Sequence, residues 1–167
     1  MSDKIKVSLK ELDTMHAAFF HSLSNTPEED AWSKAESWAK KKGLLLADSS
    51  IRIFGRNIYP TKNPEPHGYG IYITIPPNTK VEGDIPVRSI PGGLYAVAKC
   101  DGVEEMSIKW PGLWKWVENS EYQYIGETKG EHGFELGFEE YINWYSTLVS
   151  KSESKMLFDL MLQLREK

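Results

Sequence analysis

The segment between residues 26 and 43 carries both a start signal and a stop signal of an α-helix, and it constrains the fold most strongly. Thr26-Pro27-Glu28-Glu29 has the pattern of a capping box with proline at the first helical position. Apolar residues then recur at helical spacing, and Gly43 follows three lysines as a C-terminal stop signal. The sequence therefore predicts a helix over residues 27–42.

Segments rich in β-forming residues follow this helix. Residues 51–54 form a short extended piece, and residues 69–75 alternate until a Pro-Pro pair that cannot donate to a strand ladder. Residues 85–90 and 94–99 flank Pro91-Gly92-Gly93. We expect these two strands to pair across that turn as a hairpin.

An apolar stripe predicts a second helix over residues 106–117. The stripe consists of Met106, Trp110, Leu113, Trp114 and Val117. Asp101 and Glu104 offer a capping pair before it. Pro111 lies inside the pattern and predicts a kink or a restart there.

The remaining elements are shorter or open to two interpretations. Residues 122–125 and 134–142 are predicted as strands. Residues 15–23 and 156–164 are apolar without a clear period, so the pattern leaves them open between helix and strand. The element order of the second half repeats that of the first.

This order predicts an α+β fold made of duplicated strand-helix-strand-strand units, with two main helices against an antiparallel sheet. The expected organisation is a single domain over residues 1–167, with halves at about residues 10–78 and 79–164.

Composition and spacing argue against several functional classes. Cys100 is the only cysteine, and His16 and His21 lack acidic residues at metal-ligand spacing, so no disulfide, metal site or cofactor is expected. No basic stripe, signal peptide or long apolar run occurs, which favours a cytoplasmic protein without nucleic acid or membrane as direct partner. Six tryptophans suit either an aromatic core or a flat ligand site.

Six short motifs occur in order between about residues 10 and 164. They are Phe54-Gly55 followed by Pro60, Tyr69-Gly70-Ile71-Tyr72, Pro91-Gly92-Gly93-Leu94-Tyr95-Ala96-Val97, Trp110 with Leu113 and Trp116-Val117, Phe138-Glu139-Glu140-Tyr141, and Phe158-Asp159-Leu160. Their order and spacing resemble the GyrI-like family, which includes effector-binding domains of bacterial multidrug-sensing transcription regulators. Gln163-Leu164 stands where the family often has a Pro-hydrophobic pair.

The resemblance implies two pseudo-symmetric halves with a ligand cleft between them and a pocket glutamate on a late strand. Glu139 and Glu140 point to opposite faces of a strand, Glu139 with Tyr141 and Glu140 with Phe138. We favour Glu139, because its place matches the family's F-E-x-Y pattern. The alternative is that both are ordinary solvated glutamates.

Aromatic residues are the expected walls of this pocket. The candidates are Tyr69, Tyr72, Tyr95, Tyr141, Trp110, Trp116 and Phe19. Of Tyr69 and Tyr72, only one can be best placed. Trp110 and Trp114 lie on the packing stripe and suit a core position as well, whereas Trp116 lies off it.

Three functions remain open at this point. The first is binding of hydrophobic, often cationic or aromatic compounds by a stand-alone domain, for drug sensing or sequestration. The resemblance also implies a hydrolase that opens the cyclopropane ring of cyclopropanoid DNA-alkylating compounds, with Glu139 or Glu140 as catalytic base. The third is a protein-interaction module like gyrase-inhibitory members. No helix-turn-helix segment is present, so direct DNA binding is not expected.

Overall fold

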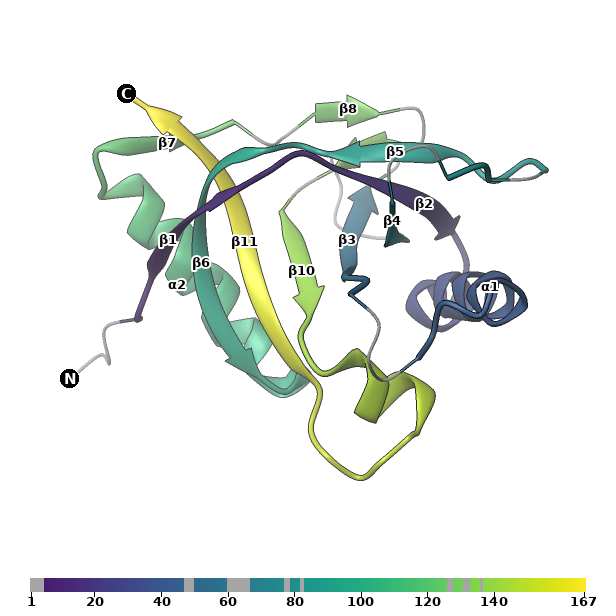
Figure 1. Cartoon of the computed structure of the whole chain (residues 1–167). Coiled ribbons are helices and arrows are strands. Elements are labelled where there is room, and N and C mark those ends of the chain that lie inside the picture. The colour runs from purple at the N-terminus through teal and green to yellow at the C-terminus, as the bar shows by residue number, and fades with distance from the viewer. Residues whose placement is uncertain are drawn as a thin grey trace.

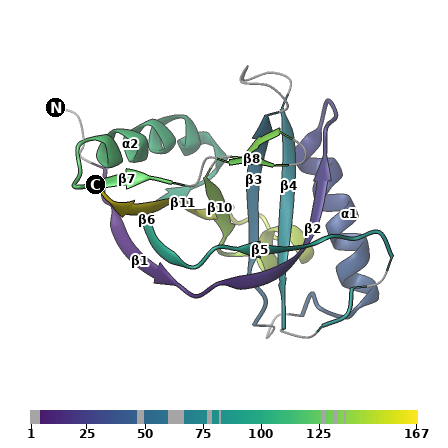
Figure 2. The same ribbon diagram turned by 90° about the horizontal axis from the view of Figure 1, so that it is seen from above.

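A computed structural model of the chain describes residues 5–46, 50–59, 67–76, 79–81, 83–125, 128–130, 133–135 and 137–167. Its strands form a curled antiparallel sheet flanked by α-helices (Figure 1, Figure 2). The first elements are β1 (Ser8–Leu12), β2 (Met15–Ser22), α1 (Pro27–Lys41), β3 (Ile53–Tyr59), β4 (Gly68–Ile75) and β5 (Val87–Ile90). They are followed by β6 (Gly93–Asp101), α2 (Met106–Glu118), β7 (Tyr122–Tyr124), β8 (Thr128–Gly130), β9 (Gly133–Glu135), β10 (Phe138–Tyr141) and β11 (Leu157–Glu166).

The two halves of the sheet repeat one pairing pattern. β2 pairs with β4 and β4 with β3, just as β6 pairs with β11 and β11 with β10. The halves meet where β3 pairs with β10, in the strand order β1-β6-β11-β10-β3-β4-β2-β5. Each half is a strand-helix-strand-strand unit, so the predicted α+β fold with a duplicated element order is confirmed.

The predicted hairpin between residues 85–90 and 94–99 is wrong. β5 pairs with β2, while β6 pairs with β1 and β11 near the other end of the sheet. The connection at Gly92 runs directly beside the connection between β1 and β2. The Gly92 N–H donates to Thr14 Oγ1 at 3.0 Å, and a Cβ on Gly92 would lie 2.6 Å from the Thr14 nitrogen. The glycine therefore allows two connecting segments of the chain to cross closely.

Both predicted helices are present, and Gly43 follows α1 with a positive φ of 67° as its stop signal predicted, but the side-chain caps predicted at the two N-termini are absent. α1 ends at Lys41, one residue earlier than expected, and the Thr26 side chain makes no cap hydrogen bond. α2 runs through Pro111 without a restart. The expected capping pair before α2 is wrong, because a 3₁₀ turn at Val103–Glu105 leads into the helix and Glu105 occupies the N-cap without a side-chain cap bond.

Several strands differ from their predicted bounds. β3 continues to Tyr59 beyond the extended piece expected at residues 51–54. The single strand expected over residues 134–142 consists of β9 and β10. The two segments that the pattern left open are both strands, β2 and β11. A π-helical turn at Tyr145–Val149 precedes β11.

Alternate side chains of the sheet enter two clusters of buried residues on its two faces. On β2, Ala18 and Phe20 join the helix-side cluster, whereas Ala17 and Phe19 join the opposite cluster. The helix-side cluster includes Ala31, Ala35, Trp38 and Ala39 of α1 with Leu113 and Val117 of α2. The opposite cluster consists of Ala17, Phe19, Phe54, Ile58, Tyr72, Ile90, Tyr95, Val97, Phe138 and Met161. Both helices therefore cover the same face of the sheet.

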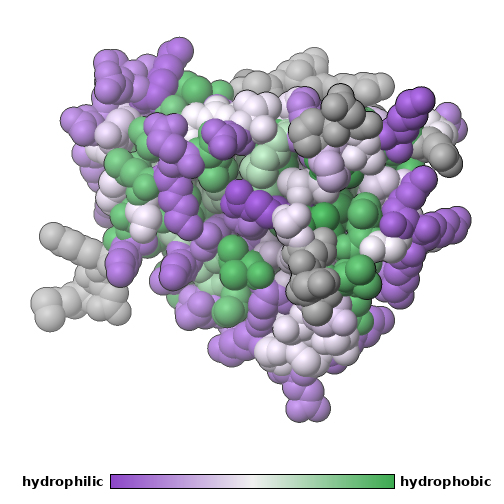
Figure 3. All heavy atoms as spheres, in the orientation of Figure 1, coloured by the Kyte–Doolittle hydropathy of each residue, from purple (hydrophilic) through white to green (hydrophobic). Residues whose placement is uncertain are grey.

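The surface shows no single dominant apolar area on the face drawn in Figure 3, where hydrophobic and hydrophilic residues are interspersed. Ile108 on α2 is the most exposed of the large apolar side chains described, at 71%. Scattered apolar residues of this kind are normal on folded proteins. None of the described helices is both long and apolar enough to cross a membrane.

Candidate functional site

Glu139 lies at the seam between the two halves, on the face that the helices cover. Only 7% of the residue is exposed. The Tyr69 hydroxyl donates to Glu139 Oε2 at 2.7 Å, and the hydroxyls of Tyr69 and Tyr141 are 2.5 Å apart. When Glu139 is ionised it can only accept, so Tyr69 gives its one proton to the carboxylate and Tyr141 donates to Tyr69. A single hydrogen-bonded chain thus links residues of β4 and β10.

Gly55 makes room for the hydrogen bonds among Tyr141, Tyr69 and Glu139. It lies on β3, between Tyr69 on β4 and Glu139 on β10, and it pairs in register with Glu139. A Cβ on Gly55 would lie 1.9 Å from the Tyr69 hydroxyl oxygen. Any other residue would therefore force the Tyr69 side chain away. The missing side chain lets the tyrosine ring pass over β3 and reach the carboxylate.

A cavity of about 210 Å³ opens against Glu139. It is lined by Asn57, Tyr59, Trp110, Trp114, Gly137 and Glu139. Asn57 and Tyr59 share a face of β3 with Gly55, while the two tryptophans are one turn apart on α2. The cavity therefore combines aromatic walls from both halves with one buried carboxylate, the composition typical of a ligand pocket.

Burial makes ionisation of Glu139 unfavourable. Desolvation raises the pKa of the Glu139 carboxyl to about 7, against hydrogen bonds from Tyr69 and from the Trp110 side chain that lower it. Burial likewise raises the pKa values of Tyr69 and Tyr141, and the nearby charge of Glu139 raises both further. Near neutral pH the carboxyl is therefore close to balance between its two protonation states, whereas both tyrosines keep their protons.

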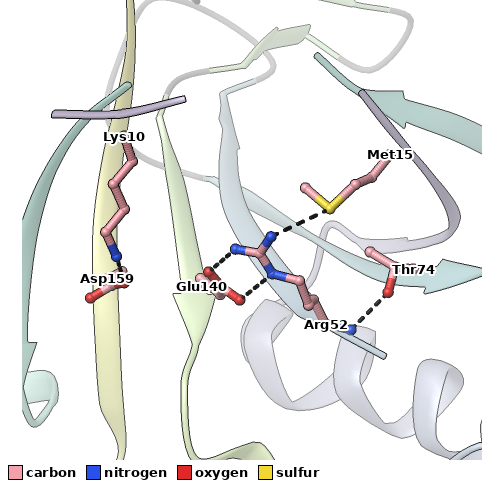
Figure 4. Close-up of polar contacts among 6 residues, drawn as sticks. All are labelled: Lys10, Met15, Arg52, Thr74, Glu140 and Asp159. Carbon is pink, nitrogen blue, oxygen red and sulfur yellow. Dashed lines mark hydrogen bonds and ion pairs between the residues drawn. The ribbon is translucent and has the colours of Figure 1, made fainter. Parts of the chain in front are cut away.

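Glu140 occupies the other face of the sheet in a different environment (Figure 4). Arg52 binds it through two hydrogen bonds, from Nε to Oε2 at 2.7 Å and from Nη2 to Oε1 at 2.6 Å. Its neighbour across the strands, Asp159, forms an ion pair with Lys10 at 3.2 Å. Both of these carboxylates therefore have a cation in contact, which the described surroundings of Glu139 do not provide.

A larger cavity of about 330 Å³ lies at the edge formed by β1 and β6. Its lining residues are Lys6, Ser8, Lys10, Val97, Lys99, Asp101, Glu105, Lys109 and Asp159. Charged side chains of both signs dominate this lining, and its buried acid is already paired with Lys10. Ligand sites are mostly apolar with few polar groups, so the smaller cavity at Glu139 is the better candidate despite its size.

The structure brings together four of the residues expected at the site: Glu139, Tyr69, Tyr141 and Trp110. Tyr72, Tyr95 and Phe19 lie instead in the opposite cluster. Trp116 is half-buried on α2, and it does not line the cavity. Of the residues named in the motifs, Pro60 lies outside the described residues.

Sequence reasoning missed Asn57 and Tyr59, and it assigned Trp114 to the core. The period of two along β3 was the available signal, since Gly55, Asn57 and Tyr59 share one face of a strand that continues past residue 54. Gly137 was missed too. A Cβ there would lie 3.1 Å from the Trp110 ring and 2.6 Å from the Met161 carbonyl oxygen, so glycine permits this close approach.

Metal binding finds no support in the described part of the chain, where no group of three or more histidine, cysteine or acidic side chains is arranged to hold an ion. The side chains of the site offer one titrating carboxyl, the phenol hydroxyls of Tyr59, Tyr69 and Tyr141, the Asn57 amide and the rings of two tryptophans.

Comparison with solved structures identifies proteins of the same fold. The C-terminal domain of EcmrR aligns with a TM-score of 0.70 and 14% identity, over 98% of this chain and 99% of that domain. In the EcmrR–DNA complex the TM-score is 0.73 at 13% identity, and this chain spans 59% of the EcmrR chain.

Two further structures share the fold at lower similarity. A hydrolase from Listeria innocua has a TM-score of 0.61 at 10% identity, over 97% of this chain and 93% of that one. SAV2435, solved with tetraphenylphosphonium bound, has a TM-score of 0.56 at 10% identity, over 96% of this chain and 94% of its own. At such low identities these similarities establish the fold alone.

Family membership is established by the sequence itself. No curated protein matches the chain closely. Residues 5–164, nearly the whole chain, match the family described as the GyrI-like small molecule binding domain. The chain therefore belongs to the GyrI-like family of small-molecule-binding domains.

Proposed function

We propose that this domain binds hydrophobic compounds that carry a positive charge, in the cavity between α2 and the ends of β3 and β10, for sensing or sequestration. The observation that carries the proposal is the buried Glu139 carboxyl, which faces an aromatic-walled cavity and has no described cation in contact. A cationic ligand would supply the missing counter-charge.

Physical chemistry favours this pairing. Ionised Glu139 is unfavourable because of burial, so a cation placed beside it recovers part of that cost. The faces of Trp110, Trp114 and Tyr59 attract the same cation, by about 0.5 to 2 kcal/mol for each good contact. A neutral ligand of the same shape gains the apolar contact but neither electrostatic contribution. The bound tetraphenylphosphonium of SAV2435, a cation in a protein of this fold, is consistent with the proposal.

A matched pair of ligands tests it. Benzyltrimethylammonium and its uncharged isostere neopentylbenzene have the same shape, so the difference in their dissociation constants isolates charge. In tryptophan-fluorescence titrations at about pH 8 we expect the cation to bind about tenfold more tightly, and Glu139→Gln to reduce this preference to the part that the aromatic rings supply. Equal affinities in the unmodified protein would contradict the proposal.

The second candidate function is hydrolysis of cyclopropanoid compounds. One observation favours it: a carboxyl whose pKa is about 7 suits a general base near neutral pH, and the Tyr59 hydroxyl, which lines the same cavity, can donate to a substrate carbonyl. Turnover of such a compound, followed by chromatography and abolished by Glu139→Gln, would support the enzyme. Saturable binding without turnover would support the binding protein.

A further inference from the structure

A second acidic residue lies beyond the aromatic wall of the Glu139 cavity. Tyr59 lines the cavity, and its ring lies 6.2 Å from the ring of His67, centre to centre. His67 Nε2 in turn lies 3.0 Å from Glu28 Oε1. The Asn57 side-chain amide donates to the Tyr59 hydroxyl at 3.2 Å and holds this wall in place. A short path of contacts thus leads from the cavity to the first turn of α1.

Glu28 is both accessible and electrically linked to the cavity. Its side chain is 51% exposed and lies in the first turn of α1, where the helix dipole favours a negative charge. Its charge raises the pKa of Glu139 and of Tyr141, while the charge of His67 lowers the pKa of Glu139. The field of Glu28 therefore reaches the buried carboxyl, even though Glu28 itself faces solvent.

We infer that Glu28 is a second anionic contact of the Glu139 cavity, and that it selects elongated ligands carrying a positive charge at each end. The inference rests on the proposed function, because it assigns one end of the ligand to Glu139. In this arrangement the inner cation contacts Glu139 and the apolar middle of the ligand crosses the ring of Tyr59. The outer cation takes the place of His67 beside Glu28.

The electrostatics distinguish ligands with one charge from ligands with two. A single cation at Glu139 leaves Glu28 paired with His67. A second cation gains an additional contact, but one that solvent screens, so its contribution is modest. Removal of the Glu28 charge should therefore weaken binding of the dication while leaving the monocation little affected.

Alkyltrimethylammonium ions and the corresponding α,ω-bis(trimethylammonium) ions of increasing chain length provide the test, because their charges do not titrate. Binding is measured by tryptophan fluorescence at about pH 8 for the unmodified protein, Glu28→Gln, Glu29→Gln and Glu139→Gln. Glu29→Gln is the matched control, since it removes the same charge from the neighbouring position on α1.

We expect the dication of best length to bind about threefold more tightly than its monocation, and Glu28→Gln to remove this advantage while Glu29→Gln keeps it. Monocation binding that depends on Glu139, with no advantage for any dication, would overturn this inference and leave the proposed function intact. An equal effect of both α1 variants would overturn it as well. If neither ion binds in a Glu139-dependent way, the proposed function fails and this inference with it.

Discussion

Two neighbouring glutamates on β10 face opposite sides of one sheet and show how differently a fold can treat the same side chain. Both are buried, with 7% of Glu139 and 8% of Glu140 exposed. Glu140 is bound by Nε and Nη2 of Arg52, whereas Glu139 receives its hydrogen bonds, among the described residues, from the neutral side chains of Tyr69 and Trp110. The compensated carboxylate suits a structural role, and the uncompensated one suits a binding site, because only the latter gains from an added cation.

The largest effect is expected from Glu139→Gln on stability. Between about pH 4.5 and 7 the folded state keeps a proton on Glu139 that the unfolded chain has lost, so stability falls as the pH rises through this window. The variant has no such proton and should be more stable than the parent at about pH 8, by roughly 3 kcal/mol. Urea unfolding at about pH 4 and pH 8 measures the difference. A variant no more stable at the higher pH would contradict the assigned burial of this carboxyl.

The opposite sign is expected on the other face. Glu140→Gln leaves Arg52 without its paired charge and should destabilise the fold by about 2 kcal/mol, a value reduced for solvent screening because the Arg52 side chain is 39% exposed. The same urea experiment measures it, with ligand affinity as the internal control. Loss of ligand affinity without loss of stability would reverse the roles assigned to the two glutamates.

Ligand binding should depend on pH in a way that reports Glu139. A permanent cation favours the ionised carboxyl, so the affinity for benzyltrimethylammonium should fall by about tenfold from about pH 8 to pH 6. Isothermal titration at several pH values checks this dependence, and Glu139→Gln should flatten it. An affinity that stays constant through neutral pH in the parent protein would argue against Glu139 as the anionic contact.

The smallest effect is expected from Tyr69→Phe. The hydrogen bond from Tyr69 lowers the pKa of Glu139, so its removal should move the midpoint of the pH-dependent binding to higher pH, by up to about one unit. Tyr72→Phe on the opposite face serves as control and should leave the midpoint in place. Equal shifts in both variants would show that the midpoint follows general stability and not this hydrogen bond.

Local patterns predicted much of the fold. The start and stop signals around α1 and the alternation along β4 act over a few residues, and both elements form where expected. The hairpin between β5 and β6 was predicted from equally local signals at Pro91-Gly92-Gly93, yet it is absent. Turn residues specify a change of direction, but they carry no information about which distant strand, β1 or β2, the chain then meets.

The same contrast between local signals and distant contacts explains why only part of the site was predicted. Alternation along Phe138-Glu139-Glu140-Tyr141 correctly separated the two glutamates onto opposite faces, since that depends on the strand alone. The meeting of Tyr69 with Glu139 depends on the absence of a side chain at Gly55, on a third strand. A sequence shows that glycine but not which ring passes over it. Tyr69 and Tyr72 therefore could not be distinguished before the pairing of strands was known.

The crossed connections at Thr14 and Gly92 also limit how this domain can admit a molecule. The first strand of each half pairs with the other half. β1 precedes β2 in the chain but pairs with β6, and β5 precedes β6 but pairs with β2. A hinge motion that separates the two halves would therefore have to break the backbone hydrogen bonds between β1 and β6 and between β2 and β5. We therefore expect a ligand to enter the Glu139 cavity through small movements of the side chains that line it.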